Sequence, residues 1–534
     1  MNRHSSTNQV ALLAIFSLAG LCSLAGCAGH NYKKEADEQA YRIIDQKWRA
    51  EYGDKANYKI SDVEPSPNDI QIEKAVAIGG VLTLPQAVAL ATAHNREYQR
   101  QREALYIKAL DLRLTRHEFE TQFFCGFSGG YNADRNDEAV GTEAGVGFKR
   151  LLAGGARIST EVAAAWVDVL TGNLRGGLAS ILSATVTQPL LAGSKREIVT
   201  EGLTQAERDT LYQVRSFNRF RKTFVVSVIT QYYTILQRFD RVKNARTNYS
   251  TLAWLSERVE KLANAGRLPL LEVDEVRQET LKASNIYSEA EREYQQAIDE
   301  FKLTLSLSTM KELRLDEGEF EALRAAEMTD PDFSEDQVIE AAQLARLDLA
   351  NSVDAVIDAQ RKVFVAADSL RAGANIVGAL GTTSARRADR QSLDSLSEDF
   401  GVGLELDLPL DRVPEQNVYR KALITLNLRQ REYEQAADTV KLQVRQAYRD
   451  LTEAAERYKV LSESLELAKQ RFNNTFLLLQ YTRASSRRVL QAQSDLFDAQ
   501  NDAGQALVDY KIAILSFYRD TGVLHVRPDG MWEL

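Results

Sequence analysis

The sequence predicts a mainly α-helical protein that also has a β-barrel, assembled from two helix–strand–strand–helix repeats. Three observations lead to this prediction. A heptad pattern in the first half of the 534 residues recurs in the second half at an offset of 216 residues, from Val273 to Val489. Two very long stretches contain neither glycine nor proline. Several short segments alternate apolar and polar residues, as strands with two different faces do.

The heptad pattern places apolar or small residues at alternating steps of three and four. This spacing is the seam of a coiled coil, along which two helices pack side by side. Many seam positions are alanines, which allow helices to approach closely. The first seam is Val273, Val276, Thr280, Ala283, Tyr287, Ala290, Tyr294, Ala297 and Phe301, and the second is Val489, Ala492, Leu496, Ala499, Ala503, Ala506, Tyr510, Ala513 and Phe517. Val228, Tyr232 and Ile235 match Val444, Tyr448 and Leu451 at the same offset.

The uninterrupted stretches are residues 203–265 and 415–503. At 1.5 Å per residue, the first would form a helix of roughly 95 Å, which an ordinary globular domain cannot bury. We expect the second stretch to turn back near Thr482–Ser486, where the first half has Gly266 and Pro269. A weaker match links the openings of the repeats. Gln86–Tyr98 and Gln337–Leu349 are both expected to begin a helix that runs into a strand-like stretch.

Period-two alternation is clearest in Gly401–Leu408, where even-numbered residues are apolar and odd-numbered residues are glycine or acidic. Further candidate strands are Phe123–Tyr131, Ala144–Lys149, Ala156–Ala164, Leu182–Thr187 and Ile376–Leu380. The pattern fits a membrane barrel with an apolar outside, and it also fits a soluble antiparallel sheet. Four to six strands are fewer than the roughly eight that the smallest closed barrels need, so a barrel would require several copies of the chain.

The N-terminus resembles a lipoprotein signal. Arg3 supplies positive charge, an apolar stretch follows, and Leu-Ala-Gly precedes Cys27. We expect Cys27 to carry acyl chains that anchor the protein in outer-membrane lipid, whereas the alternative is an ordinary signal peptide. Ala28, rather than aspartate, follows the cysteine, which resembles the pattern for outer-membrane sorting.

The chain is expected to divide into six parts. They are a signal peptide at 1–26, a lipidated arm at 27–80, a first repeat at 81–310, a linker or equatorial segment at 311–334 that contains Asp330–Asp332, a second repeat at 335–525, and a tail at 526–534.

The most specific motif is TRASSRRVLQAQ at Thr482–Gln493, whose first-half counterpart is GRLPLLEVDEV at Gly266–Val276. With the two-repeat organisation over about residues 80 to 525, the chain resembles the TolC family of outer-membrane efflux proteins. The resemblance implies a homotrimer in the Gram-negative outer membrane, with twelve barrel strands and an α-helical barrel that crosses the periplasm. It also implies docking on a periplasmic adaptor, or membrane fusion protein, coupled to an inner-membrane pump, and no cofactor or catalytic activity.

The resemblance places the hairpin turns Asn264–Leu271 and Thr482–Arg488 at the periplasmic tip, where the channel narrows. Two departures from the family pattern are Thr482, in place of glycine, and Arg488, in place of an acid. The expected tip or gate residues are Gly266, Glu272, Asp274, Glu275, Thr482, Arg487, Arg488 and Gln491. Our hypothesis is that acids from neighbouring hairpins pair with the two arginines and hold the entrance closed. The alternative is that these arginines are solvated surface residues.

Other function classes have less support. The net charge of −9 provides no basic surface for nucleic acid. The sequence contains no GxxxxGK[ST], HExxH, GxSxG or CxxC motif, and its five histidines are scattered, so neither an enzyme nor a metal site is expected. A coiled-coil tether or structural lipoprotein without a pore remains an alternative, although a tether needs no strand pairs. The sequence does not decide between efflux and protein secretion.

Overall fold

The computed structural model describes residues 31–52, 55, 58–60, 81–133, 138–169, 177–326, 333–387, 394–408, 410–481, 484–527 and 532–533. The expected signal peptide, Cys27, the Asp330–Asp332 linker and Thr482 lie outside these residues. The chain forms two compact units, and each draws on both sequence repeats. Unit 1 comprises Met1–Lys47, Tyr106–Tyr212 and Asp354–Arg431, and unit 2 comprises Trp48–Leu105, Gln213–Val353 and Glu432–Leu534.

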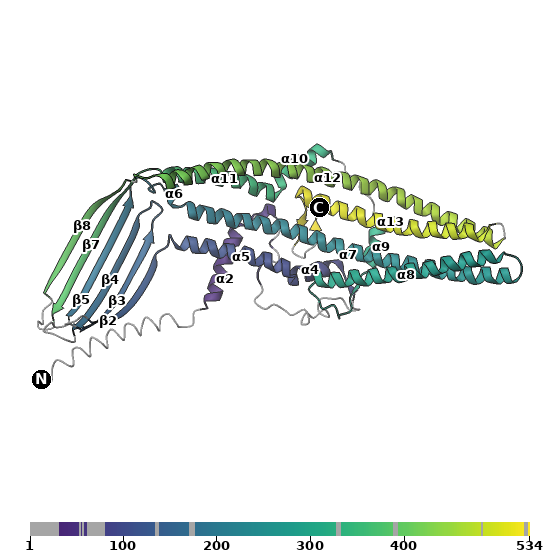
Figure 1. Cartoon of the computed structure of the whole chain (residues 1–534), viewed down its shortest axis with the longest axis horizontal. Coiled ribbons are helices and arrows are strands. Elements are labelled where there is room, and N and C mark those ends of the chain that lie inside the picture. The colour runs from purple at the N-terminus through teal and green to yellow at the C-terminus, as the bar shows by residue number, and fades with distance from the viewer. Residues whose placement is uncertain are drawn as a thin grey trace, which may run out of the picture. The chain divides into compact units, whose positions relative to one another are not determined.

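Unit 1 contains a six-stranded antiparallel sheet (Figure 1). Its strands are β2 (Gln122–Ala133), β3 (Glu138–Leu151), β4 (Arg157–Val169), β5 (Gly177–Pro189), β7 (Gly373–Arg387) and β8 (Asp394–Asp407). They lie in the order β2-β3-β4-β5-β7-β8, so the second repeat continues the sheet of the first. The β5–β7 pair joins the two repeats, with Val186 opposite Gly378.

The two faces of this sheet differ as the alternation predicts. Directly paired residues of antiparallel strands lie on the same face, and the pairings bring the apolar positions of all six strands together. Large side chains on this face are exposed, with Phe123 at 80% and Phe400 at 74%. Other exposed members are Phe127, Tyr131, Val146, Val162, Leu182, Val186, Ile376, Leu380, Val402, Leu404 and Leu406. The opposite face has glycine, serine, threonine and acidic residues, including Glu143, Glu161, Asp399 and Glu405.

The first repeat has more strands than the predicted helix–strand–strand–helix pattern contains. The second repeat has the expected two strands, whereas the first has four because β3 and β4 form an additional hairpin between β2 and β5. These two strands contain the candidate segments Ala144–Lys149 and Ala156–Ala164, whose place in the sheet the sequence left open. All six candidate strand segments of the sequence therefore belong to one sheet.

Helices of unit 1 are tied together by a network of charged side chains. It joins the start of α7 (Glu201–Asn264), which follows the short α6 (Arg196–Val199), to α11 (Leu347–Asp368). Asp358 is 5% exposed and accepts hydrogen bonds from Tyr212 at 2.5 Å and from Arg361 at 3.0 Å. Arg361 also pairs with Glu201 at 2.5 Å. The acid is buried but fully paired, as a buried charge must be.

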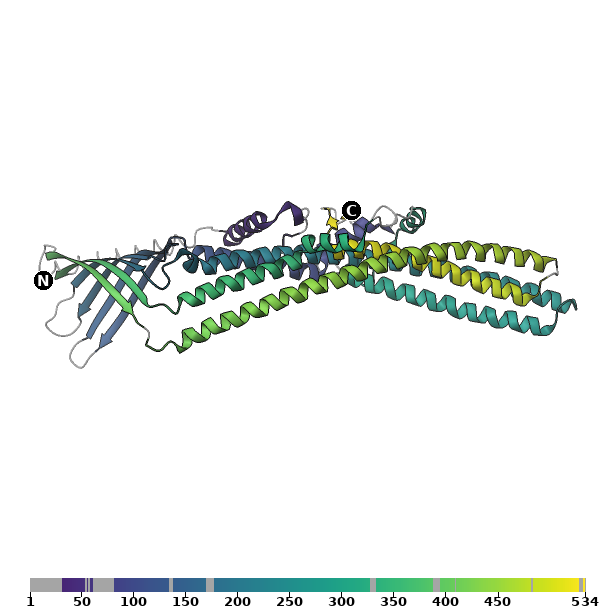
Figure 2. The same cartoon turned by 90° about the horizontal axis from the view of Figure 1, so that it is seen from above.

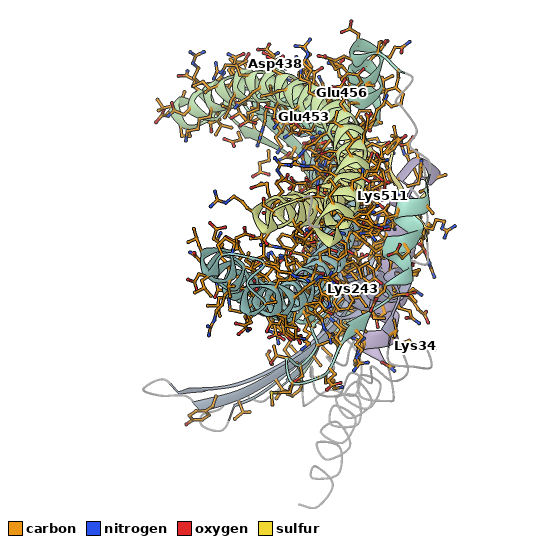
Figure 3. The ribbon with its side chains drawn as sticks, turned by 90° about the vertical axis from the view of Figure 1, so that its right-hand side faces the viewer. Lys34, Lys243, Asp438, Glu453, Glu456 and Lys511 are labelled. Atoms are coloured by element: carbon orange, nitrogen blue, oxygen red, sulfur yellow. The ribbon has the colours of Figure 1, made fainter. Side chains whose placement is uncertain are left out.

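Unit 2 contains most of two long helical hairpins, which Figure 2 shows along their length. The first joins α7 to α8 (Leu270–Thr304), and the second joins α12 (Val413–Gln480) to α13 (Ser486–Thr521). Both predicted seams are confirmed, since Val276, Ala283, Ala290, Ala297 and Phe301 of α8 are buried, as are most of the matching residues of α13. Charged residues lie off the seam, and Figure 3 shows Asp438, Glu453 and Glu456 projecting from α12.

The first helices of the two repeats resemble each other more closely in structure than in sequence. In α4 (Leu84–His94) and α10 (Glu335–Ala345), a capping box encloses the first turn, formed by Thr83 with Gln86 and by Ser334 with Gln337. Each helix then breaks at one residue before α5 (Arg96–His117) or α11 begins. The expectation of one helix leading into a strand is corrected to two successive helices, because the chain leaves helical geometry at Asn95 and Arg346.

The predicted linker is partly structured and packs into unit 2. Within it, β6 (Arg314–Leu315) pairs in parallel with β1 (Val81–Leu82), and α9 (Gly318–Ala325) buries Phe320 and Leu323. Tyr232 of the seam donates to the carbonyl of Leu82 at 2.9 Å. The remaining small elements are α2 (Tyr32–Lys47), η1 (Ala50–Tyr52), β9 (His525–Val526) and β10 (Trp532–Glu533). Among the described residues, no helix is both long and apolar enough to cross a membrane.

The end of α13 depends on Gly522, which has a φ of +85°. Its carbonyl accepts a hydrogen bond from Lys222 at 2.8 Å, and a Cβ there would lie 3.1 Å from the Ala345 carbonyl. We predict that Gly522→Ala destabilises the protein by about 1–2 kcal/mol through backbone strain. The matched control is Gly202→Ala at the start of α7, where a Cβ meets nothing within 4 Å and helix propensity favours alanine. Thermal unfolding followed by circular dichroism in detergent measures both, and equal midpoints would contradict the prediction.

Candidate functional site at the hairpin tips

The tip of the first hairpin is a tight reversal built around Gly266. This residue has a φ of +70°, and a Cβ there would meet nothing within 4 Å. The Gly266 N–H donates to the carbonyl of Ala263, and the Arg267 N–H donates to that of Leu262, both at 2.9 Å. These two bonds form a Schellman motif, which ends a helix by a left-handed residue. Pro269 then precedes the first residue of α8, so the predicted turn is confirmed.

The tip of the second hairpin follows a different local design. Helix α12 ends at Gln480, and α13 begins at Ser486 with Ser485 at its N-cap position. The turn therefore falls where the sequence predicted it, although Thr482 itself is outside the described residues. Ser486 is 1% exposed, and its N–H donates to the Glu272 carboxylate of the first hairpin at 3.4 Å. A carboxylate at this place also complements the positive end of the α13 dipole.

A small apolar core holds the two tips together within unit 2. It contains Val259 of α7, Val276 of α8, Leu479 of α12 and Val489 of α13, with Leu268 from the first turn packed against it. One residue from each of the four helices thus meets at the tip. The turn residues on either side of this core are positioned by it, because the hairpins cannot slide without breaking the contacts.

An ion pair between the hairpins joins two of the predicted gate residues. Arg487 at the start of α13 pairs with Glu275 of α8, and this hydrogen bond raises the pKa of the arginine. The arginine side chain is 75% exposed and that of Glu275 is 26% exposed. An ion pair this open to solvent contributes little to folding, because water screens both charges. It is therefore a contact that competing charges can displace without unfolding the tip.

The other predicted residues are less connected. Asp274 and Arg488 are exposed, and within the described residues no ion pair joins either side chain to another group. Gln491 donates to Asp495 at 2.7 Å. Asp495 in turn pairs with Arg471 of α12 at 2.5 Å. The structure thus brings together Glu272, Glu275, Arg487 and the end of α13, but it leaves Arg488 facing solvent.

The Arg471–Asp495 pair was not predicted, although the sequence contains a signal for it. The two residues are equally far from position 483, so an antiparallel hairpin with its turn there places them opposite each other. Arg241 and Glu293, which pair at 2.9 Å, are likewise symmetrical about the first turn. The buried hydrogen bond from Gln493 to Asn248, at 2.9 Å, joins different hairpins. No spacing rule within one hairpin could have indicated that contact.

The described residues of the tips form no metal-binding cluster in addition to these charged pairs. No group of three or more His, Cys, Asp or Glu residues in the described part of the chain could hold a metal ion. The tip instead offers exposed apolar side chains beside its charges, with Leu270 at 73% and Leu271 at 68% exposed on the first hairpin. Tyr481 on the second is 68% exposed. Such a mixture is typical of a surface that binds another protein.

Comparisons of sequence give no family model that matches the chain and no significant match to a curated protein. Comparisons of structure do find similar proteins. The MtrE outer-membrane channel of Neisseria gonorrhoeae, solved in an open state, matches with a TM-score of 0.60 and 13% identity over 90% of this chain and 98% of MtrE. The outer-membrane channel OprN matches with a TM-score of 0.60 and 15% identity over 89% of this chain and 98% of OprN.

The CmeC outer-membrane channel of Campylobacter jejuni is similar as well, with a TM-score of 0.58 and 13% identity over 89% of this chain and 91% of CmeC. Because the matches cover about nine tenths or more of each chain, the similarity extends over most of the described structure. The chain therefore has the fold of these outer-membrane channels, as the sequence predicted.

Proposed function

We propose that this chain is one subunit of a passive outer-membrane channel that serves a tripartite efflux or secretion system. The observation that supports this most directly is the sheet of unit 1, whose exposed face is apolar along all six strands. A soluble protein rarely exposes a contiguous apolar surface of this kind. The same chain also has the long helical hairpins and the fold of known outer-membrane channels. A pore-free tether would need no such sheet.

The sheet also requires association. Strands β2 and β8 lie at the ends of the strand order, and a strand edge in lipid leaves backbone N–H and C=O groups without hydrogen-bond partners. Pairing β8 of one copy with β2 of the next removes both edges and closes a cylinder. We propose the homotrimer that the family resemblance implies, with the apolar face toward lipid and the acidic, glycine-rich face toward the pore.

This orientation predicts opposite effects for neighbouring residues of β8. Phe400→Arg places a charge in the lipid near the middle of the strand, which costs about 2–4 kcal/mol. Asp399→Arg places the same side chain on the pore face, where we expect a change within about 0.5 kcal/mol. Folded trimer yield in detergent and urea unfolding in lipid vesicles measure the difference. Equal tolerance of both substitutions would rule out the proposed membrane face.

We further propose that acyl chains on Cys27 anchor the chain in the inner leaflet of the outer membrane. Helix α2 lies against α5, because Tyr106 donates to Asp37 at 2.5 Å and the rings of Tyr106 and Tyr41 are 5.6 Å apart. From Tyr106, α5 continues for about 16 Å to His117, just before β2. The chain from Cys27 to Asp37 can span about 25 Å. The lipid can therefore reach the membrane at the start of the sheet.

Replacement of the cysteine tests this anchor. We predict that the extracted wild-type protein incorporates labelled palmitate and has the added mass of acyl chains on its mature N-terminus, whereas Cys27→Ser loses both. Because the sheet itself holds the channel in the membrane, the variant should still form trimers. Cys125→Ser is the matched control, since it removes a thiol from the lipid-facing side of β2. A wild-type chain without attached lipid would refute the anchor.

We also propose that the hairpin tips of unit 2 bind a periplasmic adaptor coupled to an inner-membrane pump and form the gate. The exposed Leu270 and Leu271 supply an apolar contact, while Arg487 and Arg488 bring two positive charges per subunit to the entrance. Because the charges of three copies repel each other, acids such as Glu275 are needed nearby. The Arg487–Glu275 pair is solvent-exposed, so an adaptor could exchange its own charges for it.

Single-channel recording in planar bilayers tests both the channel and its gate. We expect brief openings of the wild-type trimer and at least a several-fold higher open probability for Arg487→Ala with Arg488→Ala. The charge exchange Arg487→Glu with Glu275→Arg should restore wild-type closure, and Arg292→Ala on the exposed face of α8 should have no effect. Unchanged openings in the double alanine variant would refute the arginine gate. Complete silence of both proteins would instead favour the tether.

A further inference from the structure

The additional hairpin of the first repeat changes the size of the proposed pore. We propose that β3 and β4 form part of the pore wall, so that three copies of six strands enclose a cylinder of eighteen strands. This inference rests on the proposed trimeric channel and goes beyond it. It implies an outer-membrane pore about half as wide again as the twelve-stranded one that the family resemblance implies, and therefore a passage for bulkier hydrated cargo.

The pairing of the hairpin with its neighbours is continuous. Strand β3 pairs with β2 from Gln122 opposite Lys149 to Ala133 opposite Glu138, without a register shift. The β3–β4 and β4–β5 ladders are equally regular, whereas the β7–β8 pair contains the one irregularity of the described sheet, between Thr383 and Ala385. The hairpin strands are 14 and 13 residues long, and β5 has 13. They thus match the height of the strands beside them.

The two faces of the hairpin continue those of the sheet. Val146 and Val162 pair across β3 and β4 on the apolar face and are 48% and 56% exposed. On the other face, Glu161 lies opposite Gly147 and between small residues. A hairpin that folded away from the membrane would have no reason to expose valines in register with the lipid-facing residues of β2 and β5. The alternation therefore indicates that lipid contacts β3 and β4 as well.

Backbone hydrogen bonding excludes a wall that omits the hairpin. Strand β2 pairs with β3, and β5 pairs with β4 on the side away from β7. If β3 and β4 left the wall, the inner edges of both β2 and β5 would be open, and direct β2–β5 pairing would need a new register. Unpaired backbone N–H and C=O groups in lipid strongly destabilise a structure, because no water is there to accept or donate hydrogen bonds. A closed wall made from this sheet therefore includes all six strands.

The number of strands fixes the width of the cylinder. For strands about 4.8 Å apart and tilted by about 40°, twelve strands give a backbone-to-backbone diameter of about 24 Å and eighteen give about 36 Å. The pore face of the hairpin adds little bulk, because Gly145 and Gly147 lie on it. A Cβ at Gly147 would come within 2.5 Å of the Phe124 ring, so this ring packs against the glycine. The wider space is therefore not filled by these side chains.

Excision of residues 138–177 provides the matched variant. It removes β3 and β4 and keeps the four-residue connection 134–137, so that Leu178 takes the place of Glu138 opposite Ala133. In the excised variant, the odd-numbered residues of β2 pair with the even-numbered residues of β5, so the apolar side chains remain on one face. The resulting first repeat has two strands, as the second has. A trimer of this variant would have twelve strands.

Two measurements on the purified trimers test the inference. Electron cryo-microscopy should show eighteen strands in the wild type. Poly(ethylene glycol) of graded size, added on the extracellular side during bilayer recording, should enter the wild-type pore up to a diameter about 1.5-fold larger than in the excised variant. A wild-type trimer with twelve strands, or equal polymer cut-offs, would overturn the inference and leave the channel intact. If the excised chain does not fold, the wild-type strand count decides, whereas a protein without trimers or conductance would refute the channel itself.

Discussion

The proposed assembly depends above all on backbone hydrogen bonding in the six-stranded sheet of unit 1. Each inner strand is paired on both sides, and one face of the sheet is apolar from Phe123 of β2 to Phe400 of β8. An apolar exposed face of this kind favours contact with lipid or another protein, and in the proposed membrane setting the two outer edges would need strands from other copies. The requirement for assembly therefore follows from the sheet alone.

The helical part is governed by a different constraint, the close approach of long helices along alanine-rich seams. A helix of 64 or 68 residues is too long for a single globular core to cover, so much of its burial comes from the helices beside it. Alanine at the seam allows the backbones to approach closely, and larger seam residues such as Phe301 and Tyr510 are buried as well. Charges are left to the outer faces and to the tips, where solvent screens them and pairs such as Arg487–Glu275 can exchange partners.

The two constraints explain why the tip and the sheet are so different as functional surfaces. In the sheet, apolar side chains gather on one face, as the proposed contact with lipid requires. At the tip, the apolar core of Val259, Val276, Leu479 and Val489 fixes the hairpins, while the turn residues around it are exposed. The charges of the tip can thus change without loss of the fold. Arg488, for example, stands where the family that this chain resembles has an acid. This separation between a rigid support and exchangeable contacts fits the proposed role of the tip in binding a partner.

Patterns along the chain were enough to determine the repeats, both seams, both turns and all six strand segments, because heptad and period-two spacing are local consequences of helix and strand geometry. The break in the helical stretch indicated Gly266, whereas the charged residues expected at the tip came from the family resemblance. Only the tertiary structure decided that β3 and β4 belong inside the sheet, that Glu275 is the partner of Arg487 while Arg488 has none among the described residues, and that Gln493 is bonded to Asn248. Strand order and contacts between hairpins depend on which distant segments meet, and periodicity specifies only which face of a segment is buried.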